Sequence, residues 1–159
     1  MTKASKQIYT HLKVGQKAPD FSIKNQEGKV VSLKEFKGKK LIIYFYPKDN
    51  TPGCTAQACN LKDNYSALQK QGYEILGVSA DSEKAHKGFI SKYELPFMLL
   101  ADTEKEMITS YGAWGEKSMY GKKYMGIMRY TFIISEKGII ENIITEVDTK
   151  NHSKQISEF

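Results

Sequence analysis

The apolar positions of this chain follow two different periods, and each period predicts its own kind of element. Spacings of three and four predict a helix from about Cys54 to Lys70, stopped by Gly72, and another running from Ser82 to about Tyr93. Continuous apolar runs, which are typical of strands buried on both faces, occur at 41–46, 74–80 and 97–100.

Hairpins and short helices complete the pattern. Hairpins are expected where two short apolar segments flank a polar turn, at 21–33 and 130–144, and short helices at 103–111 and from Asp148 or Thr149 onward. Strands alternate with helices first, and an antiparallel pair closes the chain. This order predicts an α/β fold with a central mixed sheet flanked by helices and an N-terminal β-hairpin.

The length of 159 residues fits one domain over 1–159, with room for a substantial core. No apolar stretch approaches the ~20 residues that a membrane-spanning helix needs. The segment from Met1 to Lys17 is polar and lacks the layout of a secretory signal, so a cytoplasmic location is expected. Two cysteines are too few for a disulfide scaffold, and in a reducing compartment such a pair is more often redox-active.

The net charge of +6 comes almost wholly from lysine, since Arg129 is the one arginine among 24 basic residues. The lysines are interleaved with acids, which favours a solvated surface over a phosphate-binding face. A nucleic-acid or membrane partner is therefore not expected. Arg129 itself lies inside an apolar segment, which makes it a candidate for the functional site.

Cys54 follows the first apolar strand, at the point where a turn passes into a helix. Thr51 is expected to be the N-cap and Pro52 the first helical residue, which brings the Thr51 hydroxyl near Cys54. Helix N-termini present unpaired N–H groups and partial positive charge, so a thiol there ionises more readily, and the thiolate is the reactive species. Gly53 leaves room for a small substrate. The alternative is a cysteine that serves as a small buried hydrophobe.

Cys59 lies five residues after Cys54, and this spacing constrains the chemistry. In an ideal helix the two Cα atoms are roughly 8.7 Å apart, whereas a disulfide needs less than about 7 Å. A disulfide between them therefore requires at least a turn of the helix to unwind. The stretch from Thr55 to Lys62 has few strong packing residues and contains Asn60, so this opening is expected to be cheap. The alternative is that Cys59 is a bystander.

A metal site is not expected, because the histidines are scattered along the chain and show no ligand spacing. We expect His11, His86 and His152 to be surface or packing residues.

With these residues in view, the chain resembles the peroxiredoxins, and in particular the bacterioferritin-comigratory-protein (PrxQ) class. The family pattern Pro-x-x-x-Thr/Ser-x-x-Cys is present as Pro47, Thr51 and Cys54. Similar segments extend over about residues 14–150; they include 18–21, 45–55, 76–79, 96–97, 111–117, 121–124 and 129–132.

The resemblance implies a thioredoxin-like fold and thiol-dependent reduction of hydrogen peroxide or organic hydroperoxides. It implies that Cys54 is the peroxidatic cysteine and Cys59 the resolving one, with Pro47, Thr51 and Arg129 around the sulfur. It also implies an intramolecular disulfide recycled by thioredoxin or a similar dithiol, without metal, haem or flavin cofactor. A monomer is expected, with a dimer as the alternative.

Three departures from the family pattern concern the pocket and the tail: Tyr130 stands where a small residue is common, Ser135 where an acid often ends the strand, and the last helix is short. The rival functions fit less well. A disulfide oxidoreductase of the thioredoxin type usually carries Cys-x-x-Cys, and a basic binding module would cluster its lysines. A third alternative is a chaperone-like interaction protein, for which the sequence carries no specific motif.

Overall fold

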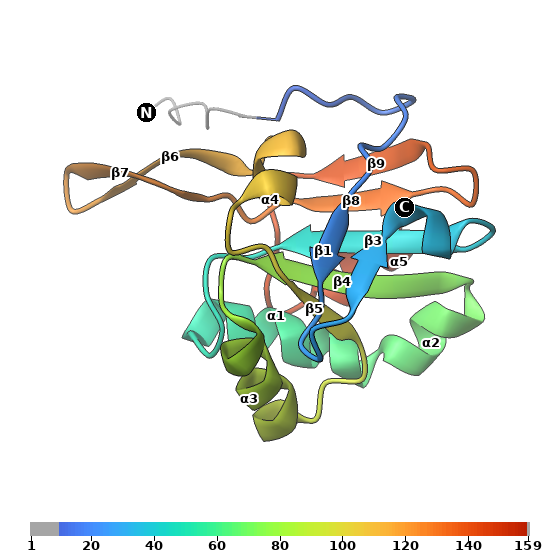
Figure 1. The fold of residues 1–159 in the computed structure, drawn as a ribbon, viewed down its shortest axis with the longest axis horizontal. Coiled ribbons are helices and arrows are strands. Elements are labelled where there is room, and N and C mark those ends of the chain that lie inside the picture. The colour runs from blue at the N-terminus through green and yellow to red at the C-terminus, as the bar shows by residue number, and fades with distance from the viewer. Residues whose placement is uncertain (1–9, 159) are drawn as a thin grey trace.

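The computed structural model of the chain describes residues 10–158, and Figure 1 shows their arrangement. The helical segments are η1 (Leu33–Phe36), α1 (Pro52–Asp63), α2 (Tyr65–Lys70), α3 (Glu83–Tyr93), α4 (Glu106–Ser110) and α5 (His152–Ser157). The strands are β1 (Ser22–Lys24), β2 (Val30–Ser32), β3 (Lys40–Phe45), β4 (Tyr73–Ser79), β5 (Met98–Ala101), β6 (Trp114–Met119), β7 (Lys122–Ile127), β8 (Thr131–Ile134) and β9 (Ile140–Ile144).

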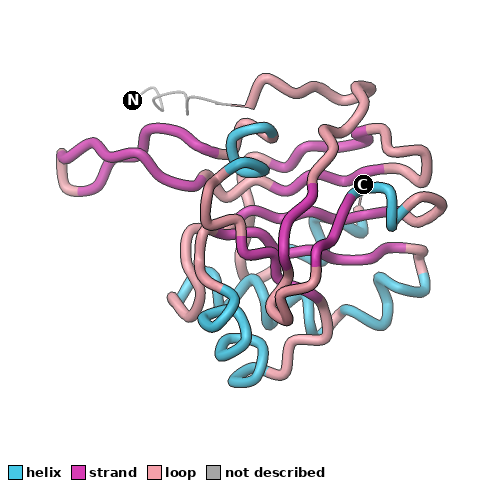
Figure 2. Tube along the Cα trace, in the orientation of Figure 1, coloured by secondary structure: helices cyan, strands magenta, loops and turns pink. Residues whose placement is uncertain are grey.

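Five strands form the central sheet, in the order β5-β4-β3-β8-β9. Figure 2 distinguishes the strands (magenta) from the helices (cyan). The pairs β3–β4 and β4–β5 are parallel, whereas β3–β8 and β8–β9 are antiparallel. The expected α/β fold with a mixed sheet and an N-terminal hairpin, β1–β2, is therefore confirmed. No helix among residues 10–158 is long and apolar enough to cross a membrane.

The central strand β3 is buried on both faces, as its continuous apolar run predicts. Because side chains alternate across a strand, its odd-numbered residues pack in one core cluster and its even-numbered residues in the other. The second cluster also contains Cys54, Ala58 and Leu61 of α1, each at most 1% exposed. The helix that carries the cysteines thus packs against one face of the central sheet.

The helix predicted from about Cys54 to Lys70 is two helices, α1 and α2, and α1 begins at Pro52, the residue expected to be the first helical one. The break is at Asn64, whose backbone leaves helical geometry at φ −111° and ψ 8°. Its side-chain amide donates to the carbonyl oxygen of Asn60 at 2.9 Å, a local bond that competes with the helical ladder. Sequence periodicity carries through this break because the apolar spacing continues on both sides of it.

The β6–β7 hairpin is a feature that the apolar pattern did not predict. It projects from the body of the molecule in Figure 1 and turns at Tyr120 and Gly121, both with positive φ, as a two-residue hairpin turn requires. Its outer half exposes both faces, so no alternation marks it; Met119 is 57% exposed and Tyr120 99%. Of the aromatic residues in this region, Tyr111 is fully buried in the core, whereas Tyr120 at the turn is exposed.

Candidate active site

Cys54 is a buried residue of the first turn of α1, directly after the loop that follows β3. Thr51 has the extended backbone of an N-cap, Pro52 is the first helical residue, and Cys54 is 1% exposed. The N–H of Thr55 donates to the carbonyl oxygen of Thr51 at 2.8 Å, which closes the first helical turn. The sulfur therefore lies at the helix end where backbone N–H groups lack helical partners.

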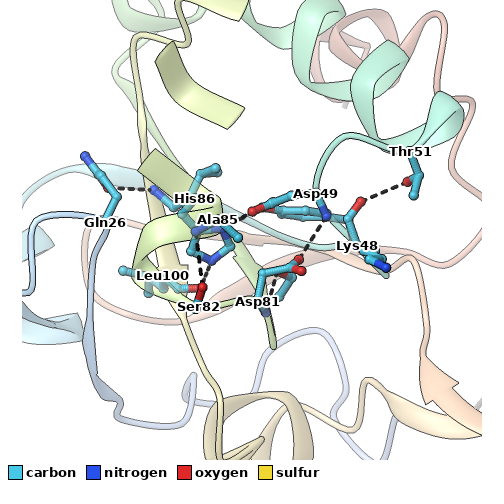
Figure 3. Close-up of polar contacts among 12 residues, drawn as sticks. Gln26, Lys48, Asp49, Thr51, Asp81, Ser82, Ala85, His86 and Leu100 are labelled. Carbon is cyan, nitrogen blue, oxygen red and sulfur yellow. Dashed lines mark hydrogen bonds and ion pairs between the residues drawn. The ribbon is translucent and has the colours of Figure 1, made fainter. Parts of the chain in front are cut away.

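The expected side-chain cap by Thr51 is wrong. Its hydroxyl donates to the carbonyl oxygen of Lys48 at 2.8 Å and does not accept from a helix N–H (Figure 3). Thr51 thus bonds within its own loop and does not cap the first-turn N–H groups with its side chain. Pro47 is half-buried in the same loop, where it turns the chain out of β3.

Arg129, which lies just before β8, is brought to Cys54 by the fold. Its Nη1 and Nη2 each lie 3.4 Å from the Cys54 sulfur, so both arms of the guanidinium face it. A Cβ added at Gly53 would lie 3.2 Å from Nη2 of Arg129, which explains why a residue without a side chain suits this position. Arg129 and Cys54, which are 75 positions apart in the sequence, are thus in direct contact.

Gln57 is a site residue that the sequence analysis missed. Its Oε1 accepts from Nη1 of Arg129 at 2.9 Å, so Gln57 orients the guanidinium that faces Cys54. It is fully buried, and its Nε2 has no hydrogen-bond partner among residues 10–158. The available signal was spacing, because a residue three positions after Cys54 lies on the same face of a helix.

Two further ionisable groups, Lys117 and Tyr44, interact electrostatically with Cys54 and Arg129. Burial lowers the pKa of the Lys117 ammonium, the charge of Arg129 lowers it further, and Cys54 raises it; the ammonium donates to the carbonyl oxygen of Ile127 at 2.8 Å. Burial raises the pKa of Tyr44 well above its ordinary value, and Cys54 contributes in the same direction. Tyr44 therefore keeps its phenolic proton near neutral pH, and Lys117 is a second basic group that interacts electrostatically with Cys54.

Cys59 lies on the same continuous helix as Cys54, half-buried, and both thiols are free. The structure is thus the reduced form, in which the helix keeps the two residues too far apart for a disulfide. The expectation that this stretch has few strong packing residues is wrong. Leu61 is fully buried, and the side chain of Asn60 is bonded to the carbonyl oxygen of Lys150 at 2.9 Å and to the N–H of Ser153 at 2.8 Å.

The histidines do not gather around the thiols. His11 is exposed, while His86 and His152 are fully buried and hydrogen-bonded, in agreement with surface or packing roles. Burial lowers the pKa of His152, whose Nε2 lies 2.8 Å from the Thr131 hydroxyl of β8. The side chain that donates to the Cys54 sulfur is therefore Arg129, with Gln57 bonded to Arg129 in turn.

Comparison with known proteins agrees with this arrangement. Residues 14–143 match the AhpC/TSA family. Peroxiredoxin Bcp of Escherichia coli K12 is 45% identical over 141 residues, covering 89% of this chain and 90% of that protein. The bcp peroxiredoxin of Coxiella burnetii is 48% identical over 145 residues, covering 91% and 96%.

Solved structures show the same relationship. Peroxiredoxin Q of Xanthomonas campestris superposes with a TM-score of 0.83 at 33% identity, covering 92% of this chain and 93% of that chain. A PrxQ variant of Xylella fastidiosa superposes with a TM-score of 0.88 at 26% identity, covering 94% and 95%. The chain therefore belongs to the AhpC/TSA family, as a thioredoxin-fold peroxiredoxin of the Bcp or PrxQ class.

Proposed function

We propose that Cys54 is the peroxidatic cysteine and Cys59 the resolving cysteine of this thiol peroxidase, with the whole chain acting as one domain. The observation that supports this most directly is the pair of Arg129 nitrogens 3.4 Å from the Cys54 sulfur at a helix N-terminus. A fixed cation and unpaired N–H groups favour an anionic sulfur, and the thiolate is the nucleophile.

In the first step the Cys54 thiolate attacks the terminal oxygen of the peroxide. An S–O bond forms and the O–O bond breaks, which gives a sulfenic acid and a hydroxide or alkoxide that takes up a proton. Negative charge moves from sulfur to the leaving oxygen, so donors fixed around both atoms stabilise the transition state. We assign this task to Arg129, held by Gln57, and to the first-turn N–H groups; Thr51 and Pro47 shape the loop that positions them.

In the second step the Cys59 thiol attacks the sulfenic sulfur, a disulfide forms and water leaves. This step requires α1 to unwind between the cysteines and Asn60 to strain or release its two bonds to the α5 region. A dithiol protein of the thioredoxin type then reduces the disulfide by exchange. The substrates we propose are hydrogen peroxide and alkyl hydroperoxides, since the bacterioferritin comigratory protein of Xanthomonas campestris has alkyl peroxide reduction activity.

The reducing cytoplasm is the location we propose, since the cycle has to return to two thiols. A monomeric state, and the lack of nucleic-acid and membrane partners, stay predictions for sedimentation and binding measurements.

Mass spectrometry after addition of one equivalent of hydrogen peroxide tests this function. We expect a product two hydrogens lighter, with no added oxygen, in which the Cys54 peptide is linked to the Cys59 peptide. A sulfenic acid on Cys59, or a protein that stays fully reduced, would refute the assignment.

Replacing Arg129 by lysine keeps the charge and removes the planar fork. Because two nitrogens can no longer face the sulfur together, we expect the rate of Cys54 oxidation to fall about 10- to 100-fold. Stopped-flow measurement with hydrogen peroxide checks this, and thermal unfolding followed by circular dichroism shows whether the fold is retained. If Arg129→Lys reacts with peroxide at the wild-type rate, the planar guanidinium of Arg129 is not needed for the reaction.

A further inference from the structure

A buried pair of ionisable side chains, Asp49 and His86, lies outside the contacts of Cys54 and joins the loop after β3 to the rest of the fold (Figure 3). Nδ1 of His86 is 2.6 Å from Oδ2 of Asp49, and Nε2 of His86 is 2.8 Å from the carbonyl oxygen of Leu100 in β5. The side chains are 0% and 5% exposed for His86 and Asp49. The hydroxyl of Tyr46 donates to Oδ1 of Asp49.

The partners of His86 fix where its protons lie. A backbone carbonyl oxygen can only accept, so Nε2 carries a proton toward Leu100. One more proton lies between Nδ1 and the carboxyl of Asp49, so the pair as a whole is neutral although it is buried. A buried pair with all its hydrogen bonds made is costly to break by removing one partner.

The same loop has further attachments to β4 and α3. The N–H of Asp49 donates to Oδ2 of Asp81 at 2.9 Å, and the Ser79 hydroxyl donates to the same oxygen at 2.6 Å. Oδ1 of Asn50 accepts from the Tyr93 hydroxyl at 3.1 Å and from the Lys92 ammonium at 3.3 Å. The loop that leads into the first turn of α1 is thus held by side chains at two successive residues.

All of these attachments are made at residues 49 and 50, which precede both cysteines in the chain. In the proposed cycle the helix that carries Cys54 and Cys59 unwinds and re-forms in each turnover, whereas residues 49 and 50 are bonded to residues outside that helix. A fixed loop immediately before the helix returns Cys54 to the same place after each cycle. A misplacement of about 1 Å in a reacting group can cost 100-fold in rate, so this placement matters for the chemistry.

We infer that the Asp49–His86 pair is a positioning device for the peroxide step, which anchors the loop before Cys54 so that the sulfur regains its place against Arg129. This rests on the proposed role of Cys54. Asp49 and His86 act through the backbone and do not touch the peroxide.

Variants of Asp49, built in a Cys59→Ser background, test the anchor by the rate of Cys54 oxidation in single-turnover stopped flow with hydrogen peroxide. Asp49→Asn can keep every bond, because its Oδ1 accepts from Tyr46 and its Nδ2 donates to a neutral His86. Asp49→Leu has similar size and makes neither bond. We expect Asp49→Leu to react about 10- to 100-fold more slowly and Asp49→Asn to react close to the parent rate.

Asp102 offers a matched control for general loss of stability. It is buried too, and its oxygens accept from the N–H groups of Glu106 and Ile108 at 3.0 and 2.7 Å in α4. Asp102→Leu leaves buried groups unpaired as Asp49→Leu does, but the side-chain bonds that it removes go to α4 and not to Asp49, Asn50 or His86. We expect it to lower the unfolding temperature and to keep the peroxide rate.

The inference is overturned if Asp49→Leu reacts at the parent rate, if Asp102→Leu is slowed as much, or if Asp49→Asn is as slow as Asp49→Leu. Should Asp49→Leu not fold, Asp49→Ser, whose hydroxyl is too short to reach His86, takes its place with the same expected loss. Failure of the proposed function is separate, since the parent itself would then not react with peroxide.

Discussion

Replacing Cys54 by serine is expected to abolish peroxide reduction. A serine hydroxyl at neutral pH is a far weaker nucleophile than a thiolate, and the side chain hydrogen-bonded to the Cys54 sulfur within residues 10–158 is Arg129, which cannot act as a base. Turnover with hydrogen peroxide and a dithiol reductant should fall at least about 1,000-fold, as it does when an enzyme loses its nucleophile. Peroxide consumption measured at steady state checks this.

The fold of Cys54→Ser should survive, because serine occupies nearly the same volume and suits the first turn of a helix. Thermal unfolding of the variant therefore serves as the control for its loss of activity. Cys59→Ser, assayed for a single oxidation, is the second control, since it removes a thiol and leaves the proposed nucleophile. If Cys54→Ser keeps full activity, Cys54 is not the nucleophile and another residue has that role.

The sheet and the cysteine-bearing helix could be predicted because their signals are local. Six apolar residues in a row, followed by a turn with Thr51 and Pro52, are sufficient to place a buried strand and a helix start. The contact of Arg129 with Cys54 was expected through the family resemblance and not from periodicity. No local pattern links residues 75 positions apart.

The anchor of the loop could not be predicted for the same reason. Asp49 and His86 are 37 positions apart, and each alone resembles a surface residue or a packing residue. The fold pairs them by placing α3 beside the end of β3. The β6–β7 hairpin escaped prediction on other grounds, since its outer half lies in solvent on both faces and burial imposes no alternation on it.

Replacing Cys59 by serine is expected to separate oxidation from recycling. Peroxide should still add one oxygen to Cys54, because Arg129, Gln57 and the first turn of α1 do not involve Cys59. Without the second thiol no internal disulfide forms, so a protein dithiol that works by exchange has no disulfide to attack. Thioredoxin-dependent turnover should fall strongly, while a small thiol such as dithiothreitol reduces the sulfenic acid slowly.

Helix content distinguishes the oxidised wild-type protein, with its disulfide, from oxidised Cys59→Ser, which carries a sulfenic acid. In the wild type, the disulfide forces at least a turn of α1 to unwind, because residues five apart in a helix cannot be bridged. Oxidised wild-type protein should therefore lose helical circular dichroism on treatment with one equivalent of peroxide, and Cys59→Ser should keep it. Unchanged thioredoxin-dependent turnover in Cys59→Ser would exclude Cys59 as the resolving residue. An equal loss of helical signal in both proteins would show that α1 unwinds without a disulfide.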